Sequence, residues 1–384
     1  MPLLATRRDR VLLACLMALA LALSLRPAVV PSPAQASVDR SGPARLVYAP
    51  GQRDSYAYAP SVVASGARTY YFSCHSRSPG EIRDSIWSGH SDGGAAQGDH
   101  LVVAPSASGW DSHHICDPSV VAGTFRYAGT TYRYAMFYLG TDRENTDNQI
   151  GVALATSLDG EWVKYPEPIV GIPAGAEDTW GVGQPSAITT DPANGEVLLF
   201  YTDGTAGTVA YRRDLVLGDL DHPTIHPPQP VPSAGLGGDV LHNFDVAYDR
   251  RRDRFYMARE AGPRPTSQPV NISERVEVDS ISAGGLRTGA GAWRVENRIT
   301  PRTTGFARNH NPGLLRTVHG TLPAGDSIEV VLSRSTVGAF PRTLYSYDLW
   351  SVTGSLSGGN AGRNSDRYHW LQLDRVGSGS PRPS

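Results

Sequence analysis

Short apolar stretches alternate with polar, glycine-rich turns along most of the chain, and the same arrangement returns at a regular spacing. A polar or small residue, usually followed by proline and then by a short apolar run, opens each copy. The five copies are Ala59–Val63, Asp117–Val121, Gln184–Ile188, Asn243–Ala247 and Asn311–Leu315. Successive copies start 58, 67, 59 and 68 residues apart. A period of this size predicts a repeat architecture.

Each copy continues with further apolar stretches that are too short for helices. The second stretch is rich in β-branched and aromatic residues and follows a turn that contains Gly or Asp, which is typical of a β-hairpin. In the first two copies a third stretch ends at an Asp-Gly turn, and a fourth closes the unit at residues 101–105 and 168–170. Four short strands in each of five units predict an all-β fold, a five-bladed β-propeller with four-stranded blades.

Residues 46–50 match residues 101–105 but precede the first unit. We therefore expect the N-terminal strand to form the outer strand of the fifth blade and to close the ring. A rival outer strand lies near 368–374. The propeller is predicted over residues 37–353, and the Gly-, Ser- and Asn-rich segment 354–384 is predicted to be a flexible tail.

Residues 1–36 have the pattern of a secretory signal peptide, with three arginines at positions 7, 8 and 10, an apolar run and a small-residue cleavage site at 34–36. We expect a secreted, extracellular protein that has no membrane association after signal removal. The mature chain would have a formal net charge of −5 in place of −2, which does not favour nucleic acid as a partner. Two cysteines would remain, Cys74 and Cys116, and in an exported chain they are expected to form a disulfide. We expect a monomer.

In a propeller, the first strand of every blade lines the central axis, so equivalent positions converge. The residues that open the five copies, here called the ring positions, are Ala59, Asp117, Gln184, Asn243 and Asn311. Four of the five are polar, which indicates either a ligand-binding funnel or a water-filled channel.

Further polar side chains precede or accompany the ring positions. Asp178 opens the third unit, where it could also cap a loop, and Glu260 ends a strand beside Arg259, where it could also form an ion pair. We take Asp117, Asp178, Glu260 and His114 as candidate catalytic residues. The candidate substrate-binding residues are Gln184, Asn243, Asn311, His242, His310, Arg308, His113 and Trp180.

These features resemble the five-bladed propeller glycoside hydrolases, which include families 43, 62, 117, 32 and 130. The resemblance is carried by residues 117–121, 134–138, 150–153 and 157–162. It implies that Asp117 matches a blade-two aspartate of family 43. The family-43 base and proton donor have no counterpart, because Ala59 and Gln184 stand at those ring positions. Family 117 is thought to use a histidine as acid, which draws attention to the four histidines at 113, 114, 242 and 310.

The predicted function is a secreted glycoside hydrolase that acts on an extracellular oligo- or polysaccharide, with arabinofuranosyl-containing glycans as first candidates. Two alternatives stay open. One is a carbohydrate-binding propeller without catalysis, which the residues at 59 and 184 favour. The other is a polysaccharide lyase that uses His or Tyr as base, with Arg308 holding a uronate. No cofactor and no metal site is predicted, although a calcium ion on the axis would be compatible with the fold.

Overall fold

The computed structural model describes residues 42–50, 55–76, 83–144, 146–237, 239, 241–338 and 347–356. The predicted signal peptide, most of the predicted tail and the rival strand near 368–374 lie outside the described residues. Within the described ranges, no helix has the length and apolar character needed to cross a membrane.

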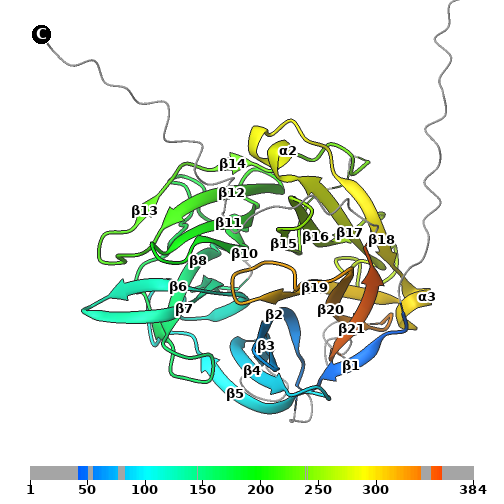
Figure 1. Cartoon of the computed structure of the whole chain (residues 1–384), viewed down its shortest axis with the longest axis horizontal. Helices are drawn as coiled ribbons and strands as arrows, with labels where there is room; N and C mark the ends of the chain where they lie inside the picture. The colour runs from blue at the N-terminus through cyan, green and yellow to red at the C-terminus, as the bar shows by residue number, and fades with distance from the viewer. Residues whose placement is uncertain are drawn as a thin grey trace, which may run out of the picture. The chain divides into compact units, whose positions relative to one another are not determined.

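Nearly all regular structure is β-strand, and the strands follow the predicted units (Figure 1). The first unit comprises β2 (Tyr58–Ser65), β3 (Arg68–Ser76), β4 (Asp84–Ser91) and β5 (Gln97–Val103). The second comprises β6 (His114–Tyr127), β7 (Thr130–Thr141), β8 (Gln149–Ala155) and β9 (Val163–Lys164). The third comprises β10 (Val182–Asp191), β11 (Glu196–Asp203), β12 (Val209–Val216), β13 (Thr224–Ile225) and β14 (Gln229–Pro230).

The fourth unit comprises β15 (Phe244–Asp249), β16 (Arg254–Ala261), β17 (Arg275–Ser282) and β18 (Arg294–Ile299). The fifth comprises β19 (Arg308–Thr317), β20 (Ser327–Ser335), β21 (Leu349–Ser355) and the N-terminal strand β1 (Arg45–Tyr48). Two short helices, α2 (Ala283–Thr288) and α3 (Pro301–Thr304), flank β18 in sequence. Figure 1 shows β2, β10, β15 and β19 near the centre and β5, β13, β18 and β1 at the rim, while β6 runs from near the centre to the left edge.

The N-terminal strand pairs where the sequence match placed it. β1 runs antiparallel to β21, with Arg45 opposite Ser351 and Leu46 opposite Trp350. It therefore adds a fourth strand to a unit that otherwise has three.

The first and fifth units are not separate sheets, which the repeat pattern alone did not predict. β19 pairs in parallel with β2, and the two units form one eight-stranded sheet. Gly313 makes this approach possible, because a Cβ at this position would lie 2.0 Å from the carbonyl oxygen of Pro60. The other four copies of the phrase carry a side chain at this position, and there the units stay apart.

Side chains two positions after the ring positions join neighbouring units. Each accepts a hydrogen bond from a backbone N–H of the next unit: Val120 to Ser61 (3.1 Å), Ala187 to Ser119 (2.9 Å), Val246 to Ser186 (2.9 Å) and Leu314 to Asp245 (2.8 Å). The buried Arg316 lies among them and donates to Ser119 Oγ at 3.1 Å and to the Val246 carbonyl at 3.0 Å. Hydrogen bonds of this kind fix the units around the site.

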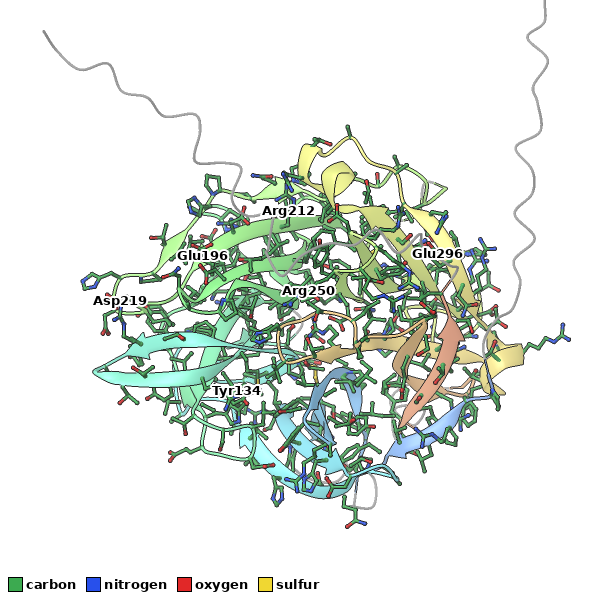
Figure 2. The ribbon with its side chains drawn as sticks, viewed as in Figure 1. Tyr134, Glu196, Arg212, Asp219, Arg250 and Glu296 are labelled. Carbon is green, nitrogen blue, oxygen red and sulfur yellow. A yellow bond between two sulfur atoms is a disulfide. The ribbon has the colours of Figure 1, made fainter. Side chains whose placement is uncertain are left out.

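Apolar side chains fill the space between the sheets. Val121 and Phe137 of the second unit, for example, pack in one core with Leu199 and Tyr201 of the third. Figure 2 shows Asp219 and Glu296 at the periphery, far from the centre. The predicted disulfide is present and joins Cys74 of β3 to Cys116 of β6. It therefore links the first and second units beside the axis.

Candidate active site

The five ring positions share one unusual backbone conformation. Their φ angles are positive, at 49° for Ala59 and Asp117, 54° for Gln184, 45° for Asn243 and 42° for Asn311. In four of the units the strand register shifts directly after this residue, which is the mark of a β-bulge. Left-handed backbone is costly for residues other than Gly, and Asn and Asp tolerate it best. The repeated phrase is therefore the sequence signature of a bulge that turns each ring residue toward the axis.

The ring residues meet around one small cavity, here called the axial cavity. It has a volume of about 30 Å³ and is lined by all five ring positions and the residues that follow them. The stretches that carry these residues lie up to 252 positions apart in the sequence. The convergence expected from the repeat is thus observed among the described residues.

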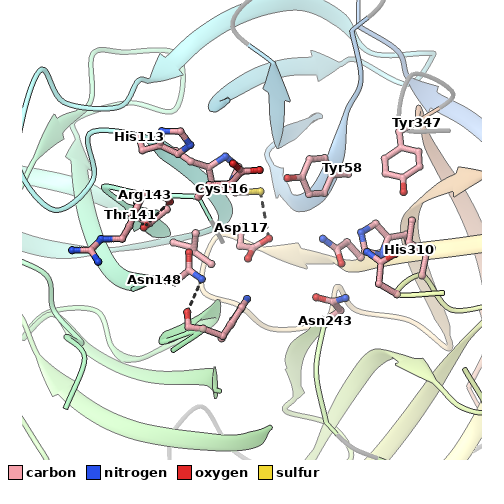
Figure 3. A pocket seen from close by; sticks show the side chains of 17 residues that line it. Tyr58, His113, Cys116, Asp117, Thr141, Arg143, Asn148, Asn243, His310 and Tyr347 are labelled. Carbon is pink, nitrogen blue, oxygen red and sulfur yellow. Dashed lines mark hydrogen bonds between the residues drawn. The ribbon is translucent and has the colours of Figure 1, made fainter. Parts of the chain in front are cut away.

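A larger hollow, here called the main cavity, adjoins the ring and is shown in Figure 3. Its volume is about 290 Å³, close to the lower end of the range for small-molecule sites. The polar and aromatic residues that line it include Tyr58, His113, His114, Asp117, Arg143, Glu144, Asn148, Trp180, Asn243, His310, Asn311 and Tyr347. Seven of the twelve candidate residues predicted from the sequence are among them, whereas Asp178, Gln184, Glu260, His242 and Arg308 do not line this cavity.

Asp117 is the carboxylate at the centre of the main cavity. Burial raises the pKa of Asp117 to about 7; the negative charge of Asp84 adds to this rise, while His310 and the Gln184 backbone N–H oppose it. The Asp117 backbone N–H donates to the disulfide sulfur of Cys74 at 3.0 Å. A carboxyl group with a pKa near neutrality is suited to proton transfer at physiological pH.

Glu260 lies beneath the cavity and holds a histidine of the cavity wall. Its Oε1 is 2.5 Å from His310 Nδ1, accepts from Asn243 Nδ2 at 2.9 Å, and accepts the Asn311 backbone N–H at 3.1 Å. The carboxylate is fully buried. Burial by itself raises the pKa of Glu260, but the charge of His310 and hydrogen bonds from His242 and His310 hold that pKa well below its usual range. Glu260 is therefore an ionised group that orients His310 through Nδ1 and leaves Nε2 to interact with a ligand.

The amides at the ring form a relay below the cavity. Gln184 Nε2 donates to Asn243 Oδ1, and Gln184 Oε1 accepts from Thr202 Oγ1 at 2.7 Å and from the Asn243 backbone N–H at 2.9 Å. These contacts occupy amide groups of Gln184 and Asn243, two residues that were predicted to bind the substrate. Asn311 differs, because its Oδ1 is buried and has no hydrogen-bond partner among the described residues. Asn311 is thus the ring amide with acceptor capacity for a ligand.

A second buried carboxylate, Asp84, organises the other side of the main cavity. Its oxygens accept hydrogen bonds from the hydroxyls of Tyr56 and Tyr58, each at 2.5 Å. Its backbone N–H donates to His114 Nδ1 at 3.1 Å. Since Nδ1 of His114 accepts, its proton is carried on Nε2, and the ring can donate toward the cavity.

Aromatic side chains form one wall of the main cavity. The ring of Tyr58 is stacked with His310 at a centroid distance of 6.0 Å and meets Tyr347 edge-on at 6.1 Å. His310 and Tyr347 lie 5.7 Å apart. Burial and then the charge of Glu260 raise the pKa of Tyr347, so its hydroxyl stays protonated. Aromatic faces beside polar groups are typical of sugar-binding surfaces.

Three of the predicted site residues, Arg308, Asp178 and His242, do not line the main cavity. Arg308 is buried and anchors the loop between β16 and β17, donating to the Ser267 carbonyl at 2.8 Å and the Pro269 carbonyl at 3.2 Å. Asp178 is exposed and pairs with Arg143 at 2.9 Å. His242 lies in a neighbouring hollow, with its Nε2 3.6 Å from Glu260 Oε2.

Asp84, Glu144 and Tyr347 belong to the site but were not among the predicted site residues. Asp84 begins β4, Glu144 lies in the exposed segment after β7, and Tyr347 precedes β21. None of them occupies the repeated phrase, and no local pattern singles them out. Tyr58 had a signal, because it stands directly before a ring position.

Among the residues that the structure describes, two groups of side chains have metal-ligand geometry, but their chemistry does not fit a metal. They are Cys74, Cys116 and Asp117, and Asp84, His114 and Cys116. Both need a cysteine sulfur that is bonded within the disulfide, whereas metal binding requires a thiolate. The absence of a cofactor and of a metal site stays a prediction.

No protein-family model matches the chain, and no curated protein matches it. Solved structures do match. A glycoside hydrolase aligns with 85% of this chain and 94% of its own length at 13% identity, with a TM-score of 0.57. The catalytic domain of a GH62 α-L-arabinofuranosidase from Coprinopsis cinerea aligns with 82% and 97% at 13% identity and a TM-score of 0.57. A family 117 glycoside hydrolase from the marine bacterium Zobellia galactanivorans aligns with 89% and 98% at 12% identity and a TM-score of 0.54.

The chain thus has the fold of the β-propeller glycoside hydrolases. The resemblance read from the sequence is confirmed at the level of the fold, and no single family is resolved. At these identities, the likeness establishes architecture, and activity has to be argued from the site.

Proposed function

We propose that the protein is a secreted glycoside hydrolase whose reaction takes place in the main cavity, between Asp117 and His310. The observation that carries the proposal is the buried Glu260–His310 pair beside a carboxyl group whose pKa is about 7. The structural neighbours, which include an α-L-arabinofuranosidase, support this assignment.

Hydrolysis of a glycosidic bond needs a proton donor at the leaving oxygen and a base or nucleophile at the sugar. In this proposal, His310 donates a proton from Nε2 while Glu260 stabilises the charged ring through Nδ1. Asp117 in its ionised form accepts a proton from the attacking water. In this proposal, Asp117 and His310 take the roles of the base and the proton donor, for which family 43 uses carboxylates at the ring positions that Ala59 and Gln184 occupy here.

The same geometry weighs against the two alternatives. A binding protein without catalysis would not need a buried, ionised glutamate fixed to a histidine of the cavity wall. A lyase with Arg308 as the uronate ligand is disfavoured, because that guanidinium is buried and engaged with the loop at residues 267–274.

We also propose the finer architecture read from the sequence, a five-bladed propeller closed between its first and last blades. The pairing of β1 with β21 and of β19 with β2 supports it. An extracellular oligo- or polysaccharide is the proposed partner, with arabinofuranosyl-containing glycans tested first. Export by the segment 1–36 and a monomeric state belong to the same proposal.

The test is a screen of the purified protein on nitrophenyl glycosides and plant and algal polysaccharides, with matched variants. Asp117→Asn and His310→Gln should each lower turnover by about 10²–10⁴-fold, the usual contribution of an acid or base. Asp219→Asn, at the periphery, is the control. Turnover that survives both site substitutions would remove these residues from the mechanism, and a protein that hydrolyses no glycan would refute the assignment.

A further inference from the structure

A second hollow, here called the side cavity, adjoins the main cavity and has no role in the reaction as proposed above. Its volume is about 430 Å³, within the range of small-molecule sites. Trp180 lines both cavities, so a ligand longer than one sugar could extend from one to the other. The question is which chemistry the side cavity would accept.

The walls of the side cavity combine an aromatic ring with glycines. The Trp180 ring packs on Gly204, where a Cβ would lie 2.8 Å from the ring, and on Gly183, where it would lie 3.1 Å away. Asn148 Nδ2 donates to the Trp180 carbonyl at 2.6 Å and fixes the backbone there. A Cβ at Gly262 would likewise lie 2.7 Å from Asp239 Oδ1. The glycines thus let the indole and the Asp239 carboxylate lie directly against the backbone, and the indole forms one wall of the side cavity.

The charge of the side cavity is carried by Arg264. This residue is exposed, and its guanidinium donates to the Asn271 carbonyl at 2.6 Å and contacts His242 Nε2. Among the described residues, no carboxylate lies within ion-pair distance of Arg264. The carboxylate of Asp239 lines the same cavity, but it is already bound by Arg259 at 2.9 Å and by the Gly262 N–H at 2.8 Å.

The side cavity is also joined to the reacting pair. Arg264 contacts His242, His242 Nε2 lies 3.6 Å from Glu260 Oε2, and Glu260 Oε1 holds His310 at 2.5 Å. Glu260 thus lies between the two cavities, hydrogen-bonded to His310 on one side and close to His242 on the other. A ligand bound by Arg264 would lie at one end of this chain, with the proposed proton donor at the other.

We infer that the side cavity is a subsite for an anionic sugar residue, which Arg264 recognises while Trp180 contacts the ring. The guanidinium presents paired donors that match a carboxylate or a sulfate. The inference rests on the proposed function and specifies its substrate: a glycan that carries a uronate or a sulfate ester next to the residue that is cleaved.

The experiment measures the affinity of the Asp117→Asn protein, in which turnover is expected to be strongly reduced, for matched monosaccharides. D-Galacturonate and D-galactose 6-sulfate are each compared with D-galactose, and the same three forms are compared in the glucose series, by NMR titration. We expect at least one anionic sugar to bind about five- to tenfold more tightly than its neutral partner, as for a charged hydrogen bond. The two anionic arms distinguish uronate from sulfate.

Arg264→Gln should abolish this preference, Arg264→Lys should retain part of it, and Arg302→Gln, an exposed arginine on α3, should leave it unchanged. Equal binding of neutral and anionic sugars in both series would overturn the subsite, as would a preference that survives Arg264→Gln. If the wild type hydrolyses neutral glycans but lacks the preference, the subsite alone is rejected. If it hydrolyses no glycan, the proposed function falls first.

Discussion

Asp117→Asn should make the protein more stable at neutral pH while it removes activity. The substitution keeps the size of the side chain, and Asn tolerates the left-handed backbone at this ring position. What changes is the ionisable group, whose pKa the structure raises from 3.8 to about 7. At about 1.4 kcal/mol for each pH unit, this rise corresponds to about 4 kcal/mol. Water in the cavity makes that figure an upper bound.

The direction of the pH dependence of stability follows from whether the folded or the unfolded protein holds the proton of Asp117. Between about pH 4 and pH 7, the unfolded chain has an ionised Asp117, whereas the folded protein retains the proton. Stability therefore falls as pH rises through this window, and the full penalty is present above pH 7. In the Asn variant this contribution is absent. The free energy of unfolding of the variant minus that of the wild type should thus grow by up to about 4 kcal/mol from pH 4 to pH 8.

The assay is urea unfolding followed by tryptophan fluorescence at several pH values across this window. Asp178→Asn is the matched control, because it makes the same change in the same left-handed backbone at a carboxylate that is 82% exposed. All other titrating groups are common to the compared proteins and cancel. A stability difference between Asp117→Asn and wild type that does not vary with pH would refute the assigned burial of this carboxyl group.

Three further predictions concern the reaction and the joints between units. If Asp117 is the base, kcat/KM should rise as pH increases through about 7, the pKa of that group; a fall through the same range would assign it as the acid. Gly313→Ala should cost about 3 kcal/mol or more, because the new Cβ would meet the Pro60 carbonyl at 2.0 Å; an unchanged Tm in thermal unfolding would contradict the close approach of β19 and β2. Replacing Cys74 and Cys116 by serine opens a loop with a sequence separation of 42 residues. This replacement should lower the free energy of urea unfolding by about 4 kcal/mol. Equal stability of the variant and the wild type would contradict a stabilising role of the disulfide.

The repeat could be read from the sequence because each unit encodes it locally. Each bulge lies within a phrase of five residues, in which the left-handed residue is followed, in four of the five copies, by proline and in all five by an apolar run. The five phrases therefore fixed the ring positions, including Asp117, Asn243 and Asn311. The outer strand at residues 46–50 was found for the same reason, since it repeats a local pattern.

The chemistry of the site was decided by contacts between units, which no local pattern encodes. The histidines at 242 and 310 keep the buried Glu260 ionised. Arg308, a predicted ligand-binding residue, instead anchors the loop between β16 and β17. Asp84 influences Asp117 from a different unit. Burial and charge act through space over a few ångströms, whereas the sequence orders these residues 18 to 50 positions apart. The sequence alone therefore determined which residues face the axis, and only the tertiary structure decided which of them are buried, paired or open to a ligand.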